Sequence, residues 1–321
     1  MRSVQGALMS LIDVNGIRLY YEERGRGPAV LFVSGATGDA GHWAKVADIL
    51  ADANKVITYD RRANSRSPRP AGWASTTIGE QADDAAALLR GLGLVPAIVF
   101  GTSAGAGILA DLCLRHPQVP RGAIFHEPVF PSGVSNLGAV RAGRKALVEE
   151  GMARGGPRAA GELYLRSVAG DEVYESLDPL LRERLLGNAE VLFGIEMAPY
   201  LAYEPTPGRL ATIRVPRAVT AGADSRDPAA AGHWRYEPAQ WLAAHLETPL
   251  IELPGAHMGY LGQPEHFARA LRPILDGLTD LAGRTGTTRV RAEMNHRGGR
   301  RPGPARPAPR SGQPPLRKPG R

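Results

Sequence analysis

The chain has 321 residues, of which 43% are hydrophobic and 22% are charged, and this suits one large globular domain or one domain with an insertion. Its formal net charge of +7 comes from the C-terminal end, because residues 284–321 carry ten Arg and one Lys against a single acid, Glu293. The remainder is slightly acidic, so the overall charge gives no argument for a nucleic-acid-binding or membrane-surface protein.

Both ends of the chain are predicted to lie outside the folded domain. Residues 1–10 have no signal-peptide core and are predicted to be flexible, with Met1 or Met9 as the start. Residues 284–321 hold seven Pro and six Gly, which predicts a disordered Arg/Pro/Gly-rich tail. A single cysteine, Cys113, allows no intrachain disulfide, and no apolar run is long enough to span a membrane. We therefore expect a cytoplasmic protein.

Strand-like and helix-like segments alternate from residue 11 to residue 130. Residues 11–21 predict a hairpin that turns at Asn15-Gly16. Apolar runs predict strands at 29–33, 56–59, 95–100 and 122–125, and helical spacing predicts helices at 42–53, 78–92 and 106–114. Strands separated by helices pair in parallel, so the predicted fold class is α/β, with a doubly wound and mostly parallel sheet.

This alternation is interrupted after residue 130. Helical periodicity without a convincing strand covers 131–212, with helices expected at 140–153, 158–168, 179–186 and 189–197. Strands return at 215–220 and 249–253, with helices at 238–246 and 264–278. We predict a sheet domain made of 11–130 and 213–280, with 131–212 as a helical insertion on top of it.

A Gly-x-Ser-x-Gly motif, Gly101-Thr-Ser-Ala-Gly105, joins a predicted strand directly to a predicted helix. In this context the motif is typical of a nucleophile elbow, a tight turn that holds Ser103 strained and exposes its hydroxyl. The N-terminal N–H groups of the following helix point to the place where an oxyanion would form. Ser103 is therefore the candidate nucleophile.

A serine nucleophile needs a general base and a group that orients the base. His257 follows the last predicted strand and lies on the same edge of a parallel sheet as the elbow, so we take it as the base. Asp224 follows an earlier strand and keeps the chain order Ser, acid, His, which makes it the preferred acid. Glu127, at the end of the strand after the elbow, and Asp227 remain alternatives.

The tetrahedral intermediate of acyl transfer also needs backbone hydrogen-bond donors. The N–H of Ala104, next after the nucleophile, is one candidate. The second is the N–H of Ala36, in the Gly-rich segment 34–41 that follows the first parallel strand. This segment lacks the spacing of a nucleotide-binding loop.

The chain resembles the α/β-hydrolase fold superfamily over about 11–280, as a serine hydrolase with a helical cap. The resemblance is carried by the oxyanion loop at 33–43, the elbow at 101–105, the segment Gly255-Ala-His257 and a bracing loop at 59–67. Ala63 and Ser65 replace two family glycines in the bracing loop, and the acid loop Gly222-Ala-Asp224 is one residue shorter than usual. The resemblance implies a Ser-His-acid triad.

These expectations favour a carboxylesterase-like enzyme that cleaves an ester or related acyl bond of a small, mostly apolar substrate through an acyl-enzyme. The cap supplies an apolar set with some hydroxyl groups, namely Tyr164, Tyr174, Phe193, Met197, Tyr200 and Tyr203. No cofactor and no metal is required, and no nucleic-acid or membrane partner is expected. Alternatives are a cofactor-free perhydrolase, a lactonase, a thioesterase, a C–C bond hydrolase or a non-catalytic binding protein.

Overall fold

The structure is a computed structural model that describes residues 6–230 and 232–297, with side chains described as far as Ala282. Strands β1 (Leu8–Val14) and β2 (Ile17–Arg24) form the predicted hairpin, in which Asn15 and Gly16 both have positive φ, 48° and 71°. Two such residues fit a two-residue hairpin turn. Because Leu8 and Met9 pair with Glu23 and Glu22, the predicted flexible segment 1–10 extends too far along the chain.

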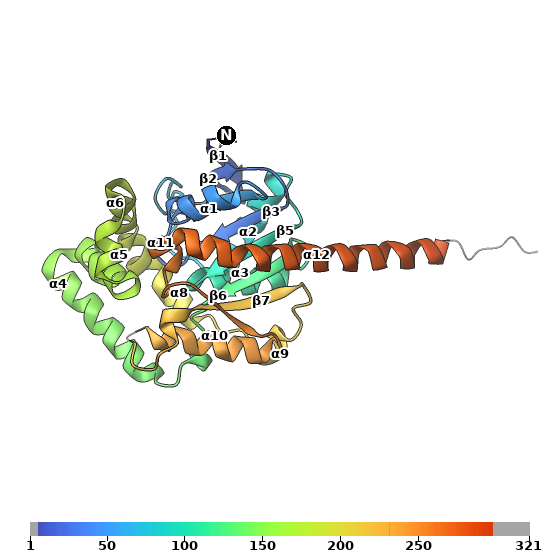
Figure 1. Ribbon diagram of the computed structural model, residues 1–321. Coiled ribbons are helices and arrows are strands. Elements are labelled where there is room, and N and C mark those ends of the chain that lie inside the picture. The colour runs from blue at the N-terminus through green and yellow to red at the C-terminus, as the bar shows by residue number, and fades with distance from the viewer. Residues whose placement is uncertain (1–5, 231, 298–321) are drawn as a thin grey trace, which may run out of the picture. The chain divides into compact units, whose positions relative to one another are not determined.

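Within the described residues, eight strands form one sheet in the order β1-β2-β4-β3-β5-β6-β7-β8 (Figure 1). The two pairings of β2 are antiparallel and all the others are parallel, which confirms the predicted mostly parallel sheet. The remaining strands are β3 (Ala29–Val33), β4 (Lys55–Tyr59), β5 (Ala97–Thr102), β6 (Pro120–His126), β7 (Arg217–Gly222) and β8 (Leu250–Leu253).

Both faces of the sheet are covered, as neighbouring residues of β5 show. The Phe100 ring packs against the rings of Trp43 and Phe267, whereas a Cβ on Gly101 would lie 2.4 Å from the Gly105 carbonyl oxygen. Successive residues of a strand point to opposite faces. Trp43 and Phe267 therefore belong to helices on one face, and Gly105 belongs to a helix on the other.

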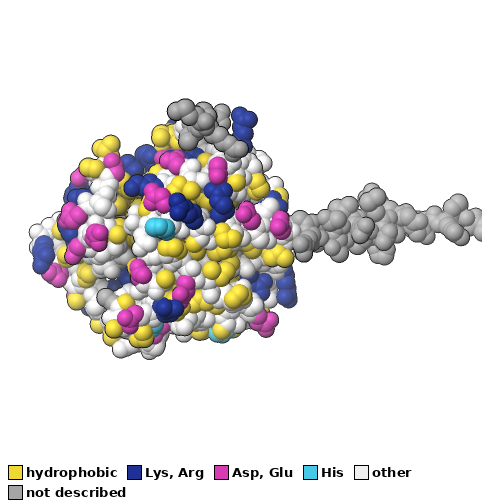
Figure 2. Space-filling model, viewed as in Figure 1, with side chains coloured by type: hydrophobic (Ala, Val, Ile, Leu, Met, Phe, Trp, Pro, Cys, Tyr) yellow, Lys and Arg dark blue, Asp and Glu magenta, His cyan; other side chains and the backbone are white. Residues whose placement is uncertain are grey.

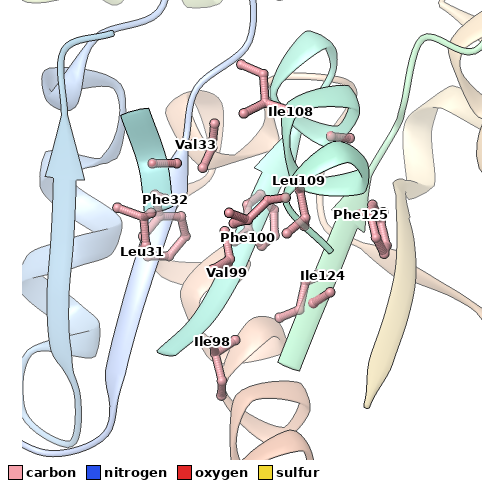
Figure 3. Close-up of a cluster of buried hydrophobic side chains, with 14 of the residues drawn as sticks. Leu31, Phe32, Val33, Ile98, Val99, Phe100, Ile108, Leu109, Ile124 and Phe125 are labelled. Carbon is pink, nitrogen blue, oxygen red and sulfur yellow. The ribbon is translucent and has the colours of Figure 1, made fainter. Parts of the chain in front are cut away.

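The helices that flank the sheet follow the predicted order. They are η1 (Ala40–Trp43), α1 (Ala44–Leu50), α2 (Ile78–Gly91), α3 (Ala104–Arg115), α10 (His233–His245), α11 (Gly259–Gly262) and α12 (Pro264–Arg297). The apolar runs of β3, β5 and β6, with Ile108 and Leu109 of α3, make the centre of the core (Figure 3). Helix α12 continues past the predicted start of the tail at 284, and residues 298–321 of that predicted tail lie outside the described residues.

Between β6 and β7 all the regular elements are helices or helical turns. The elements are η2 (Pro131–Gly133), α4 (Leu137–Ala169), α5 (Asp171–Ser176), α6 (Pro179–Gly187), α7 (Ala189–Val191), the π-helical turn η3 (Leu192–Glu196), α8 (Met197–Ala202) and α9 (Pro207–Leu210). Gly155 and Gly156 interrupt α4 with non-helical backbone angles, which agrees with the two separate helices predicted there. The segment α4–α8 is called the cap below.

Polar contacts join the cap to the loops at the carboxyl ends of β3 and β4. Arg184 of α6 donates to the Asp39 carboxylate at 2.5 Å. Asn188 donates to the Thr37 carbonyl oxygen and accepts from the Ser65 N–H. A cap held by side chains on both loops has a defined position over this edge of the sheet.

The bracing loop after β4 folds around the Asp60 carboxylate, which accepts from the N–H groups of Ala40 and Arg66. Ala63 and Ser65, which replace the family's glycines, both have positive φ, 59° and 50°. Positive φ costs little for Gly and more for other residues. The loop therefore keeps its conformation without the residues best suited to it.

The surface agrees with a body of low net charge. On the face drawn in Figure 2, acidic and basic side chains are interspersed over both the cap and the sheet domain. In the part of the chain that the structure describes, no helix combines the length and apolar character needed to cross a membrane.

Candidate active site

Ser103 lies between β5 and α3 with φ 54° and ψ −124°. A positive φ is uncommon for a residue with a side chain and marks a strained turn. The flanking glycines are required by close backbone approaches: a Cβ on Gly105 would lie 2.3 Å from the Val33 carbonyl oxygen, and one on Gly101 would be similarly close to Gly105. The motif therefore has the geometry of a nucleophile elbow, as its sequence predicts.

His257 follows β8 and is hydrogen-bonded to Glu127. Its Nδ1 lies 2.6 Å from Glu127 Oε2, and the other oxygen of that carboxylate, Oε1, accepts the Gly222 N–H at 2.8 Å. Glu127 is fully buried one residue after the end of β6, and its φ is 41°. A carboxylate at Nδ1 fixes the imidazole tautomer and leaves Nε2 available to a nucleophile.

The structure does not bring Asp224 to His257, which corrects the preferred acid. Asp224 lies in the short turn η4 (Ala223–Ser225), where its side chain is exposed and its backbone N–H donates to the Gly255 carbonyl oxygen. Asp227, the other alternative, accepts from the nearby Ala229 N–H. The strand β7 ends at Gly222, and the turn after it carries both carboxylates outward. The carboxylate hydrogen-bonded to His257 is that of Glu127.

The Glu127 carboxylate remains ionised across the ordinary pH range. Burial acts to raise its pKa, but the hydrogen bond from His257, the nearby His257 and His126 side chains and the Gly222 N–H together lower it to about 2. For His257 burial is the largest influence and lowers the pKa, the partner Glu127 acts to raise it, and the positive charges of Arg235 and Arg144 lower it further. The net effect keeps the imidazole neutral, which is the form a general base needs.

The oxyanion loop touches the elbow. A Cβ on Gly35 would lie 2.8 Å from the Ser103 Cβ, so the backbone of the loop passes directly beside the nucleophile. Within the described residues, neither the Ala36 N–H nor the Ala104 N–H donates to a protein acceptor. Both predicted donors are therefore free to bind an oxyanion.

Arg61 holds the peptide group that contains the Ala36 N–H. Its Nη2 donates to the Gly35 carbonyl oxygen at 3.0 Å. Because the C=O and N–H of a trans peptide point in opposite directions, this bond directs the Ala36 N–H away from Arg61. The same guanidinium donates to the Glu196 carboxylate of the cap in a buried ion pair and pairs with no other carboxylate among the described residues. Nothing in the sequence identifies this positioning role, because it depends on a pairing 135 residues apart.

Glu196→Gln is expected to destabilise the protein by about 3 kcal/mol, because it leaves the Arg61 charge buried without a counter-charge. Chemical denaturation of wild type and variant measures the difference in the free energy of unfolding. The matched control is Glu183→Gln, since Glu183 is a cap glutamate whose ion pair with Arg158 is exposed, and it is expected to cost no more than about 1 kcal/mol. Equal losses in the two variants would contradict the role of the buried pair.

An apolar cavity of about 450 Å³ lies between the cap, the segment that follows β6 and the start of α10. Of the cap residues predicted to form a substrate pocket, Tyr164, Phe193 and Met197 line it. Tyr174 packs in a separate cap cluster, Tyr200 hydrogen-bonds to Gln81, and Tyr203 donates to Asp111.

The wall of this cavity does not include Ser103 or His257, but it includes Val129, two residues after Glu127. Arg144, which also lines the cavity, is close enough to His257 for its charge to lower the pKa of that histidine, so the cavity lies near the Glu127–His257 pair.

Cys113 lies inside the apolar helix α3 and is buried. Burial raises the pKa of Cys113 to about 12, as expected for an inert thiol inside an apolar helix. In the described ranges, no three or more His, Cys, Asp or Glu side chains lie close enough together to hold a metal ion.

Comparison with known proteins identifies relatives over most of the chain. The family described as alpha/beta hydrolase fold matches residues 28–264. An uncharacterized hydrolase from Bacillus subtilis, YraK, is 32% identical over 83% of this chain and 95% of its own length. A zearalenone hydrolase from Cladophialophora bantiana is 29% identical over 81% of this chain and 93% of its own length. A thermophilic esterase from Thermogutta terrifontis has a similar structure, with a TM-score of 0.65 at 20% identity, over 85% of this chain and 99% of that chain.

Proposed function

The chain belongs to the α/β-hydrolase fold family, and from this premise we propose that it is a serine hydrolase that cleaves a carboxylic ester or related acyl bond. Ser103 attacks the carbonyl carbon, His257 accepts the hydroxyl proton and later donates it to the leaving group, and Glu127 orients the imidazole. The Ala36 and Ala104 N–H groups stabilise the oxyanion. Water then releases the acid from the acyl-enzyme.

The observation that carries the proposal is the hydrogen bond between His257 Nδ1 and Glu127 Oε2 at 2.6 Å, on a histidine that follows the last strand of a sheet with a nucleophile elbow. A purely binding protein has no need for a buried Glu-His pair beside a strained serine. The pair and the elbow together favour catalysis over the non-catalytic alternative.

The substrate is proposed to be small and mostly apolar on one side of the scissile bond. Support comes from the cavity of about 450 Å³, whose wall is formed largely by Val, Leu, Met, Phe and Trp side chains. Esters and lactones with an apolar acyl portion fit this description. Zearalenone belongs in the first substrate panel, because a hydrolase named for it is 29% identical to this chain.

The direct test combines covalent labelling with turnover. A fluorophosphonate probe is expected to label the protein, with mass spectrometry placing the adduct on Ser103, and p-nitrophenyl esters of increasing acyl length are expected to be hydrolysed with a pre-steady-state burst. Absence of both labelling and turnover across esters, thioesters and lactones would contradict the proposal and favour a binding protein.

The pH profile of kcat/KM is expected to fall on its acid side with a midpoint below the ordinary histidine value of 6.5. The reason is that the pKa of His257 is lowered by burial and by the two arginines despite Glu127, so the neutral base survives to lower pH. Initial rates with a neutral ester, from about pH 4 to pH 9, measure this midpoint. A midpoint at or above 6.5 would contradict the expectation.

Stability has its own pH dependence, which the rate measurements must account for. Because the pKa of Glu127 is lower in the folded protein than its ordinary value of 4.5, its stabilising contribution is present above pH 4.5 and is lost as the pH falls toward 2. Rates at the acid end are therefore to be read together with the circular dichroism signal at the same pH.

A further inference from the structure

The wall of the apolar cavity also contains the charged side chains of Arg141, Arg144, Lys145 and Glu149. Lys145 pairs with Glu149, whereas Arg144 has no acidic partner within the described residues. Arg144 of α4 is half-buried among apolar side chains of that wall. Its one hydrogen bond to protein runs from Nη2 to the Tyr164 hydroxyl at 2.9 Å, and its guanidinium lies over the Tyr164 ring, 5.4 Å from the centroid. Nε and Nη1 have no acceptor within the described residues, so most of the donor fork of this arginine is unused.

A second guanidinium lies close by. Arg235 of α10 is only 5% exposed, and its one hydrogen bond goes to the Ser167 carbonyl oxygen at 3.3 Å. Both guanidinium groups lie over the ring of Trp234, at 5.1 Å for Arg144 and 4.4 Å for Arg235 from the centroid. Trp234 also lines the cavity. The two positive charges are therefore gathered around one aromatic side chain at the cavity.

This arrangement is costly without an anion. Neither Arg144 nor Arg235 forms an ion pair with any carboxylate in the described part of the chain, whereas buried charges in proteins are normally paired. Burial and the positive charge of Arg144 lower the pKa of Arg235 to about 10. The Glu127 carboxylate acts to raise the pKa of Arg235, but its two oxygens are hydrogen-bonded to His257 and Gly222 and it forms no ion pair with either arginine within the described residues. A guanidinium without an acidic partner can donate two parallel hydrogen bonds to a carboxylate, because both groups are planar.

We propose that Arg144, reinforced by the buried charge of Arg235, binds a carboxylate group of the substrate. The substrate class is then an ester or related acyl compound with an apolar chain that ends in a carboxylate, such as a monoester of a dicarboxylic acid. The reactive carbonyl lies at Ser103, the apolar part of the substrate occupies the cavity past Val129, and the carboxylate of the substrate binds Arg144. This inference rests on the proposed function for the reaction and on the cavity for the specificity.

The kinetic test compares matched substrates. Mono-p-nitrophenyl esters of straight-chain dicarboxylic acids, in a series of chain lengths, are compared with the same compounds whose free carboxylate is capped as a methyl ester. Wild type is expected to favour the free carboxylate at one chain length. Arg144→Gln is expected to lower kcat/KM for that carboxylate substrate by about 10- to 100-fold, the range of a charge-assisted hydrogen bond, and to change the capped substrate by less than about 3-fold.

Two further variants keep the kinetic test decisive. Arg235→Gln is expected to lower the preference for the carboxylate in the same direction, and its thermal unfolding shows whether the protein remains folded. Arg158→Gln, which lies in α4 beyond the interruption at Gly155 and Gly156 and pairs with Glu183 at the surface, is expected to leave the preference unchanged. An equal loss for free and capped substrates in Arg144→Gln, or no preference for the free carboxylate at any length, would overturn the proposal.

A binding measurement separates this inference from the catalytic proposal. Isothermal titration of the Ser103→Ala variant with the monomethyl ester of the best dicarboxylic acid, and with its dimethyl ester, requires no turnover. Tighter binding of the monoester, lost when Arg144→Gln is added, supports the carboxylate site even if no ester is cleaved. Equal binding of the two esters would overturn the site while leaving the serine chemistry to be judged by labelling.

Discussion

Ser103→Ala is expected to lower kcat by a factor on the order of 10⁴ to 10⁶, because it removes the atom that forms the acyl-enzyme. Alanine keeps the Cβ, so the backbone strain at φ 54° is unchanged and the fold should be retained. Steady-state hydrolysis of an activated ester, with thermal unfolding of both proteins, measures the two effects separately. A variant within tenfold of wild type would show that another group performs the attack.

Ser103→Gly is the variant to compare with Ser103→Ala, because it removes the Cβ as well as the hydroxyl. Glycine adopts positive φ at little cost, so this variant should be as inactive as Ser103→Ala but more stable by about 1 kcal/mol or more. A higher midpoint of thermal unfolding for Ser103→Gly than for Ser103→Ala would attribute the strain to the nucleophile itself. Equal midpoints would mean that the elbow carries no such strain.

The features that the sequence predicts well are local or depend on the alternation of strands and helices. The elbow needs only Gly101, Ser103 and Gly105 between a strand and a helix, because the close approaches that exclude a side chain involve the neighbouring backbone. His257 is found by its place after the last strand, since all parallel strands end on one edge of the sheet. The elbow and the place of His257 can therefore be predicted from the sequence without knowing which side chains are in contact.

The acid is harder to predict because two strand ends offer a carboxylate. Glu127 follows β6 and Asp224 follows β7, and these strands are neighbours in the sheet. What separates the two residues is the path of the chain after each strand. The backbone at Glu127 adopts a positive φ and keeps the side chain buried, whereas η4 turns Asp224 into solvent. The unusually short acid loop was the one signal in the sequence that favoured Glu127.

The cap presents the same difficulty over longer distances. Helical spacing predicts most of its helices, but the contacts that connect Glu196 to Arg61 and Arg144 to Trp234 join segments far apart in the chain. A charged residue on a predicted helix is most often a solvated one. Only the folded chain shows that Arg235 is buried and has no carboxylate in an ion pair with it among the described residues. This is why the sequence indicates an apolar pocket but no charged group within it.

Glu127→Gln is expected to lower kcat by about 10⁴-fold, and Asp224→Asn by less than about 2-fold, for the same ester. The carboxylate accepts two hydrogen bonds, one from the Gly222 N–H and one from His257 Nδ1. Glutamine offers a single oxygen, so its amide nitrogen must face one of these two donors. If it faces Nδ1, the imidazole adopts the tautomer with the proton on Nε2, and the base can no longer accept the Ser103 proton.

Glu127→Asp tests the same orienting role, because it shortens the side chain and keeps its charge. Aspartate keeps both acceptor oxygens but is one methylene shorter, so the 2.6 Å contact to His257 is lengthened while the tautomer is still favoured. Its kcat should therefore lie between those of wild type and Glu127→Gln. A loss of activity in Asp224→Asn that matches the loss in Glu127→Gln would restore Asp224 to the triad. If neither variant loses activity, His257 acts without an orienting acid, and the buried pair serves only to hold β6 and the His257 loop together.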